Sequence, residues 1–329
     1  MEYKTDILTG VRPTGGLTVA NYLGAVNVVK NFQDQGCSTL VFVADLHALT
    51  DREPFQIKDN ALEVVADYLA LGIDPQRTKI FLQSAIMGET TSLMALLARQ
   101  TTVAELLRVP TLKDKLKNNA NPENANALLL FYPVLMAADI LLQKAKQVPV
   151  GEDQLVHLEI TRRLAERFNK KYGEVFALPQ PLKIKSLRLL SLKGEGKMSK
   201  TNPDGALFLT DTPKEIEKKI KSAETAFEGK MNERLESHIL IAKSLAKNEA
   251  QRSEIDEIIK EHQAGKAVMG KFKQAMTEIT QNFIADFQEN RQKIIEDPGY
   301  IQSILEEGNK IARTNAQETL EAAKKALGL

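Results

Sequence analysis

Two segments that lie far apart in this chain have the residue types of a nucleotide-phosphate site. Residues 13–22 read Pro-Thr-Gly-Gly-Leu-Thr-Val-Ala-Asn-Tyr, and residues 196–201 read Gly-Lys-Met-Ser-Lys-Thr. The first is typical of a loop that runs into a helix and presents backbone N–H groups to a phosphate. In the second, Lys197 and Lys200 stand three residues apart on a short loop. Their ammonium groups could stabilise charge as it moves onto a leaving pyrophosphate.

Each segment also has a simpler interpretation. Residues 10–15 lack the Lys-Ser/Thr of a Walker loop and the Gly-x-Gly-x-x-Gly dinucleotide pattern, so a plain tight turn explains them equally well. Residues 196–201 could be a basic surface loop. The presence of both segments in one chain favours the phosphate site.

Further polar side chains are expected at the ends of apolar strands. Asp45 and His47 follow the run at residues 39–43, and Glu152 and Asp153 follow residues 147–150. Ligands bind beyond the carboxyl ends of such strands, where a ribose hydroxyl could be held. More ordinary roles are also open: His47 could be a core or surface histidine, and the two acids could favour a helix N-terminus.

Asp139 is the single acid of an apolar helical segment, residues 135–142. A buried carboxylate is costly unless it meets a donor. The donor could be a bound amine, an indole N–H, or a protein group such as an arginine or a helix-end amide. The spacing of acids, histidines and the single cysteine predicts no metal site.

Strands and helices alternate through the first part of the chain, which predicts a parallel sheet with helices on both faces. The fold class is therefore α/β, with a Rossmann-like parallel-sheet domain and inserted helices. The polar run at residues 118–124 predicts a loop within the helical insertion at about 90–142. We expect strands at residues 6–10, 39–43, 79–83 and 147–150, and helices at 21–34, 56–71 and 152–171.

Beyond about residue 206 the chain has few prolines or glycines and is expected to be helical. Its charges nearly cancel, and an apolar stripe recurs at helical spacing at residues 272, 276, 279, 283 and 287. We therefore predict two domains, a catalytic one over residues 1–205 and an all-helical one over 206–329.

Composition narrows the class of protein. The 329 residues carry 44 basic and 43 acidic side chains, so the total charge of +1 gives no argument for a polyanion partner. Residues 162–200 are locally basic, with 11 Lys or Arg against 3 Glu, which suits phosphate or nucleic acid but also a solvated helix face. No long apolar run predicts a membrane span, no export signal is evident, and the composition fits a cytoplasmic protein.

The two phosphate segments resemble the HIGH and KMSKS signatures of class I aminoacyl-tRNA synthetases. Residues 132–141, 148–154 and 157–162 resemble motifs of the bacterial tryptophanyl-tRNA synthetases within that class. The resemblance implies two steps: ATP and Mg²⁺ activate L-tryptophan to tryptophanyl-adenylate, and the aminoacyl group then passes to tRNA(Trp). It also implies a homodimer formed through the inserted helices, and a helical domain that binds the tRNA anticodon.

The resemblance implies a role for individual residues. Thr18 and Asn21 would contact the ATP phosphates, Lys197, Lys200 and Lys115 would stabilise the pyrophosphate, and Asp139 would accept the indole N–H. The nucleotide site would comprise Arg12, Thr14, Gly15, Ala20, Asn21, Gly151, Asp153, Gln154, Lys197, Met198, Ser199 and Lys200. The tryptophan site would comprise Leu8, Gly10, His47, Met136, Asp139, Val148 and Val150.

Four positions depart from the family pattern. Thr201 stands in place of serine and keeps the hydroxyl. Ala20 stands in place of the usual glycine, Arg12 in place of a frequent glutamine, and Leu8 in place of a frequent aromatic residue. They bear on amino-acid preference and efficiency, and they motivate a competing assignment as a non-catalytic tRNA-binding paralogue. A tyrosyl-tRNA synthetase of the same fold and a different nucleotidyltransferase with a similar sheet also compete with the tryptophan assignment.

Overall fold

The computed structural model describes residues 2–50, 54–117, 125–151, 154–183 and 189–329. Its centre is a five-stranded, wholly parallel sheet in the order β3-β2-β1-β4-β5. The direction of strand order changes at β1, because β2 and β3 follow on one side and β4 and β5 on the other. In a sheet of this kind the ligand crevice lies beyond the carboxyl ends of the strands at that switch point. The strands are β1 (Thr5–Val11), β2 (Thr39–Val43), β3 (Thr78–Leu82), β4 (Ala145–Val150) and β5 (Gln180–Lys183).

The inner strands are buried on both faces, as parallel strands generally are. In β2, Val41 and Val43 belong to one apolar cluster, whereas Leu40 and Phe42 belong to another on the opposite face. The predicted limits of β2 are confirmed, and the other three predicted strands are found within one or two residues at each end. The short polar strand β5 was not predicted. It carries Pro181 and lies at the sheet edge, where a missing N–H is tolerated.

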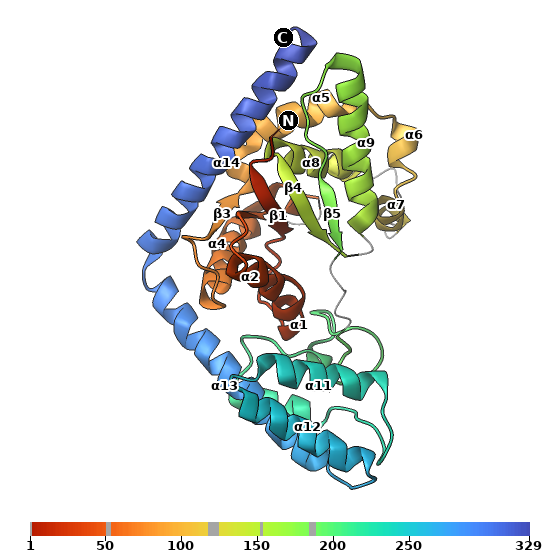
Figure 1. Cartoon of the computed structure of the whole chain (residues 1–329), viewed down its shortest axis with the longest axis vertical. Helices are drawn as coiled ribbons and strands as arrows, with labels where there is room; N and C mark the ends of the chain where they lie inside the picture. Colours follow the sequence, from red (N-terminus) through yellow and green to blue (C-terminus); the bar gives the residue numbers. More distant parts are fainter. Residues whose placement is uncertain (1, 51–53, 118–124, 152–153, 184–188) are drawn as a thin grey trace.

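Helices cover both faces of the sheet and continue beyond it (Figure 1). The helices between strands are α1 (Val19–Asn21), the π-helical η1 (Tyr22–Val26), α2 (Asn27–Asp34), α3 (Asp45–Ala48), α4 (Pro54–Ala70), the 3₁₀ turn η2 (Gln83–Ile86), α5 (Met87–Ala98), α6 (Val103–Leu106), α7 (Pro110–Lys117), α8 (Ala127–Leu142) and α9 (Leu155–Tyr172). After β5 come the 3₁₀ turn η5 (Pro203–Gly205), α10 (Pro213–Lys221), α11 (Glu233–Leu245), α12 (Glu249–Gln263), α13 (Met269–Ile295) and α14 (Pro298–Leu327).

The first helix begins earlier than expected. The sequence pattern predicts a start at Asn21, but α1 begins at Val19 because Thr18 caps it and Asn21 completes a capping box. Leu23, Val26 and Val29 are buried, whereas Phe32 is only half-buried. The predicted loop at residues 118–124 lies outside the described residues.

The last helix, α14, returns to the sheet and runs along its edge strand β3 (Figure 1). Asn309 Oδ1 accepts a hydrogen bond from the Leu82 N–H at 3.0 Å, and Lys79 pairs with Glu307 at 2.8 Å. A Cβ at Gly308 would lie 1.9 Å from the Ile80 carbonyl oxygen, so only glycine permits this approach. The helical character of residues 206–329 is confirmed, and a domain boundary between residues 205 and 206 remains a prediction.

None of the described helices combines the length and the apolar character that crossing a bilayer would require.

Candidate active site

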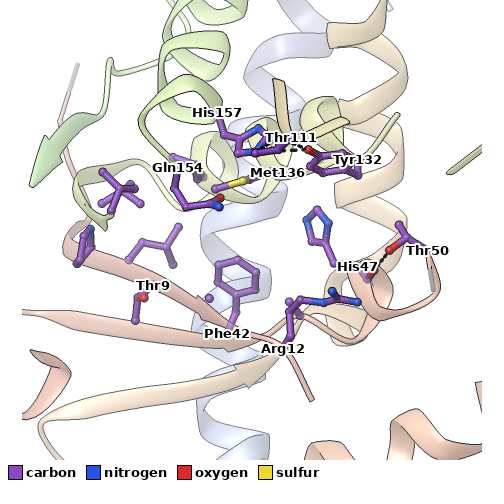
Figure 2. A pocket seen from close by; sticks show the side chains of 17 residues that line it. Thr9, Arg12, Phe42, His47, Thr50, Thr111, Tyr132, Met136, Gln154 and His157 are labelled. Carbon is purple, nitrogen blue, oxygen red and sulfur yellow. Dashed lines mark hydrogen bonds between the residues drawn. The ribbon is translucent and has the colours of Figure 1, made fainter. Parts of the chain in front are cut away.

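A cavity of about 440 Å³ opens at the carboxyl ends of β1, β2 and β4, at the switch point of the sheet (Figure 2). Its volume lies in the range of small-ligand sites, and its wall is mostly apolar. Eight of the predicted site residues line it: Leu8, Gly10, Arg12, His47, Met136, Val148, Val150 and Gln154. The remaining wall was not predicted and comprises Thr9, Phe42, Ala44, Thr50, Thr111, Tyr132, Ile140, Pro149 and His157.

Gly10 gives the cavity part of its shape. It pairs with Phe42 across β1 and β2, and a Cβ at Gly10 would lie 2.5 Å from the tip of the Phe42 ring. Any side chain at this position would therefore push the ring out of its place in the cavity wall. The glycine at the end of β1 thus serves the packing of the cavity floor rather than a turn.

Asp139 lies behind the cavity wall rather than in it. Its Oδ2 hydrogen-bonds with His47 Nε2 at 3.0 Å and accepts from Gln83 Nε2 at 2.7 Å. Among the described residues no partner meets Oδ1, although the side chain is only 3% exposed. Burial raises the pKa of the Asp139 carboxyl, while the hydrogen bond from His47 opposes that rise. The structure thus supplies protein donors for one oxygen and leaves the other for a further donor.

Gln83 organises this corner of the site and was missed by sequence reasoning. Its side-chain oxygen accepts hydrogen bonds from the backbone N–H groups of Leu46 and His47 at 3.1 and 3.2 Å, and its amide nitrogen holds Asp139. The residue is fully buried. The available signal was its place directly after β3, where a polar side chain reaches the active edge of the sheet.

Three polar side chains from three helices meet on the wall that lies across the cavity from Phe42 (Figure 2). Thr111 Oγ1 in α7 lies 2.6 Å from the Tyr132 hydroxyl in α8 and 2.8 Å from His157 Nε2 in α9. Tyr132 and His157 are buried and also contact each other edge to face. This group ties the inserted helix α7 to the cavity. Lys115 lies on the same helix, and its side chain is outside the described residues.

The predicted phosphate loop leads from β1 into α1. Gly15 has a φ of +80°, a conformation that glycine adopts readily. Thr18 is almost fully buried, and its hydroxyl accepts from the Asn21 N–H at 3.3 Å while Asn21 Oδ1 accepts from the Thr18 N–H at 3.0 Å. Both side chains therefore cap the helix in this structure, and their contact with phosphate stays a prediction. Ala20 is half-buried in the first turn.

The second predicted loop meets the first. Lys200 Nζ donates to the Gly15 carbonyl oxygen at 2.8 Å and to Thr14 Oγ1 at 3.1 Å. Lys197 is exposed, whereas Met198 is buried in an apolar cluster that also includes Val19. The two lysines are thus held differently, one docked on the phosphate loop and one facing solvent.

Backbone contacts also join the start of α1 to the segment that follows the second loop. The Val19 N–H donates to the Leu207 carbonyl at 2.9 Å, and the Leu209 N–H donates to the Leu17 carbonyl at the same distance. Ser199 and Thr201 bond through their hydroxyls at 2.9 Å. Gly151 follows β4 as predicted, while Asp153 lies outside the described residues.

Comparison with known proteins identifies the family. The sequence profile described as "tRNA synthetases class I (W and Y)" matches residues 2–285. A tryptophan–tRNA ligase of Treponema pallidum (strain Nichols) is 36% identical over 330 residues, covering 98% of this chain and 96% of the relative. One of Bacillus subtilis (strain 168) is 37% identical over 339 residues, covering 99% and 98%.

Solved structures give the same result for the fold. The tryptophanyl-tRNA synthetase of Campylobacter jejuni, complexed with ADP and tryptophan, superposes with a TM-score of 0.83 at 32% identity and covers 98% of this chain and 100% of that chain. The Mycoplasma pneumoniae enzyme gives a TM-score of 0.86 at 33% identity, with 99% and 98% covered. The Rossmann-like fold class predicted from the sequence is therefore confirmed.

Proposed function

Because this chain belongs to the class I tRNA synthetases of the W and Y type, we propose that it activates L-tryptophan with ATP and transfers it to tRNA(Trp). The observation that carries this proposal is the contact of Lys200 with Gly15, 185 residues away, beside a mostly apolar cavity at the switch point of the sheet. Two signatures with a common chemistry converge there, as a triphosphate site requires. The enzyme is a ligase.

The cavity is assigned to the amino acid. An indole ring suits a mostly apolar cavity of about 440 Å³. Met136, Val148 and Val150 contribute apolar wall, and the ring N–H is assigned to Asp139 Oδ1, which is buried and has no donor among the described residues. A substrate without this donor would leave the buried Oδ1 of Asp139 unpaired, which is a strong basis for selectivity.

Arg12 is the cationic side chain of the cavity wall, and Figure 2 shows it on the same side of the cavity as His47. A guanidinium at the end of β1 would hold the carboxylate of tryptophan. In the first step one oxygen of that carboxylate attacks the α-phosphate, a new O–P bond forms, and the bond from that phosphorus to the pyrophosphate breaks. Arg12 would orient the attacking carboxylate, and the step itself requires little proton transfer.

The two loops are assigned to ATP. Lys200 and Lys197 would neutralise charge on the departing pyrophosphate, and the backbone of Thr14 and Gly15 would approach the phosphates. Gly151 and Gln154, at the end of β4 and the start of α9, would contact the nucleoside and the substrate. Mg²⁺ would be carried mainly by the ATP phosphates, because Mg²⁺ in nucleotide sites is bound largely through substrate phosphates and water.

Amino-acid-dependent ATP–pyrophosphate exchange with each of the twenty amino acids tests this function, followed by charging of tRNA(Trp). We expect exchange with tryptophan alone and charging of tRNA(Trp) but not of tRNA(Tyr). Exchange with tyrosine would reassign the substrate, and tRNA binding without exchange would indicate a non-catalytic paralogue. The homodimer, the anticodon-binding role of the helical region and the cytoplasmic location remain predictions.

A further inference from the structure

Lys197 lies on a small hairpin, residues 189–198, that overlaps the start of the second phosphate loop. The Met198 N–H donates to the Leu189 carbonyl at 2.8 Å, and Lys197 pairs with Leu190 in an antiparallel bridge. The turn contains Gly194, whose φ of +77° favours glycine. Because the Lys197 side chain is exposed, the hairpin backbone rather than side-chain packing sets where its ammonium group can reach.

Two charged residues of the helical region, Glu224 and Arg234, hydrogen-bond to the turn of this hairpin. Arg234 Nη2 in α11 donates to the Gly194 carbonyl at 2.6 Å, and Glu224 Oε1 accepts from the Gly194 N–H at 3.2 Å. Glu224 and Arg234 also form an ion pair with each other. The Glu224 N–H adds a hydrogen bond to the Leu192 carbonyl at 2.9 Å. Both backbone groups of one glycine are therefore held by two charged partners, which make stronger hydrogen bonds than neutral ones.

A further contact fixes the hairpin beside Lys197 itself. The Leu190 N–H donates to Ser237 Oγ in α11 at 2.8 Å, and Ser237 is buried. Leu190 is the residue that pairs with Lys197. The hairpin is thus attached to α11, whereas Lys200 is docked on the loop after β1.

We propose that Glu224 and Arg234 are positioning residues for Lys197: their clamp on Gly194 holds the hairpin so that the ammonium group reaches the departing pyrophosphate. This inference rests on the proposed function, because it takes Lys197 as a group that stabilises that anion. Neither residue is among those assigned to the nucleotide site. They act through the hairpin, and misplacement of a catalytic group by about 1 Å can cost roughly 10²-fold in rate.

Steady-state ATP–pyrophosphate exchange by Arg234→Met tests the clamp. We expect kcat to fall roughly 10- to 100-fold, with an unchanged KM for tryptophan, because the cavity is untouched. The matched control is Arg252→Met. Arg252 likewise pairs with a glutamate, Glu249, at 3.4 Å and donates to a carbonyl, that of Ala246, at 3.0 Å, but on α12 away from the hairpin. The control should retain wild-type kinetics.

The same substitution in a Lys197→Ala background separates positioning from general damage. If the clamp acts through Lys197, Arg234→Met causes no further loss in that background. An equal loss in both backgrounds would overturn the proposal, as would a parallel rise in the KM for tryptophan. If Arg234→Met has normal exchange and Lys197→Ala loses it, the proposed role of the clamp is wrong and the proposed function still stands. Normal exchange by both variants would contradict the role of Lys197 itself.

Folding is checked by thermal unfolding of each variant. If Arg234→Met is unfolded at the assay temperature, Glu224→Gln replaces it, because glutamine keeps an acceptor for the Gly194 N–H and removes the ion pair. We expect this milder variant to lower kcat less than Arg234→Met and still to depend on Lys197. Wild-type kcat in folded Glu224→Gln and Glu224→Ala would contradict the clamp.

Discussion

The cavity and the loops beside it are built in different ways. The cavity wall comes from strand ends and helices, and its polar groups hold one another: Gln83 binds Asp139, which binds His47. The phosphate side is assembled from loops, where Lys200 rests on Gly15 and Lys197 faces solvent. The affinity for the amino acid should therefore depend on the side chains of the cavity wall, and the rate of its activation by ATP on the position of the loops.

The largest effect is expected at the loop. Lys200→Ala should lower the exchange rate by about 10²- to 10³-fold, because an ammonium group aimed at developing charge is lost. Tryptophan affinity, measured by equilibrium binding without ATP, should stay near wild type. An unchanged exchange rate would remove Lys200 from the chemistry, and a loss of tryptophan binding would mean that loop and cavity do not act separately.

Acid should destabilise the folded protein through a buried histidine of the helical region. His238 in α11 is fully buried, and burial followed by the charges of Arg234 and Lys273 lowers its pKa from 6.5 to about 4. The folded state therefore binds this proton less readily than the unfolded state. The stability contribution is complete above pH 6.5 and is lost as pH falls toward 4, by roughly 3 kcal/mol.

Denaturant unfolding of the wild type and of His238→Leu across this pH range measures that loss. The variant should lack this part of the pH dependence, because leucine has no proton to bind. Identical pH dependence in both proteins would show that His238 does not titrate as described. His262→Leu serves as a comparison variant in the same unfolding experiment. His262 is also a buried histidine of the helical region, but its Nε2 hydrogen-bonds with the Lys230 carbonyl at 2.8 Å.

A smaller effect is expected from the acid behind the cavity wall. Asp139→Ala should weaken tryptophan binding by about 1–3 kcal/mol, since a buried hydrogen bond to the ring N–H is lost. Isothermal titration calorimetry measures the affinity directly. Because Asp139 also binds His47 and Gln83, thermal unfolding of the variant serves as the control. Unchanged tryptophan affinity in a folded variant would place the ring nitrogen elsewhere.

The smallest effect concerns the wall formed with α7. Thr111→Val removes the hydroxyl that bridges Tyr132 and His157 but keeps the side-chain shape. We expect tryptophan affinity to fall by about 1 kcal/mol, the usual net value of one neutral hydrogen bond. Titration of the variant with tryptophan checks this. A much larger loss of exchange than of affinity would show that α7 serves the phosphate side instead.

The same contrast explains what could be predicted from sequence. The strand at residues 39–43 was located correctly because a continuous apolar run signals a strand buried on both faces. This strand and the one at residues 147–150 then predicted that His47, Val148 and Val150 lie at one edge of the sheet, and all three line the cavity there. Such predictions succeed because the ends of parallel strands share one edge.

Several further features depend on packing that a sequence pattern does not specify. An amphipathic helix shows that it has a buried face but not what it covers, so the return of α14 to β3 was not predicted. The hydrogen bonds of Gln83 and the contact of Thr111 with Tyr132 and His157 likewise need three-dimensional neighbours. Thr18 and Asn21 are a different case. The polar groups that cap α1 are the same groups that a phosphate contact would use, so the sequence does not distinguish the two roles.

The most direct test of this account is a crystal structure with ATP, Mg²⁺ and a tryptophan analogue that lacks the attacking carboxylate. We predict that the Lys200 ammonium leaves the carbonyl of Gly15 and bonds to a phosphate oxygen, with the indole in the cavity beside Met136. A fully occupied complex in which Lys200 stays on Gly15 and the phosphates bind out of its reach would contradict the central claim.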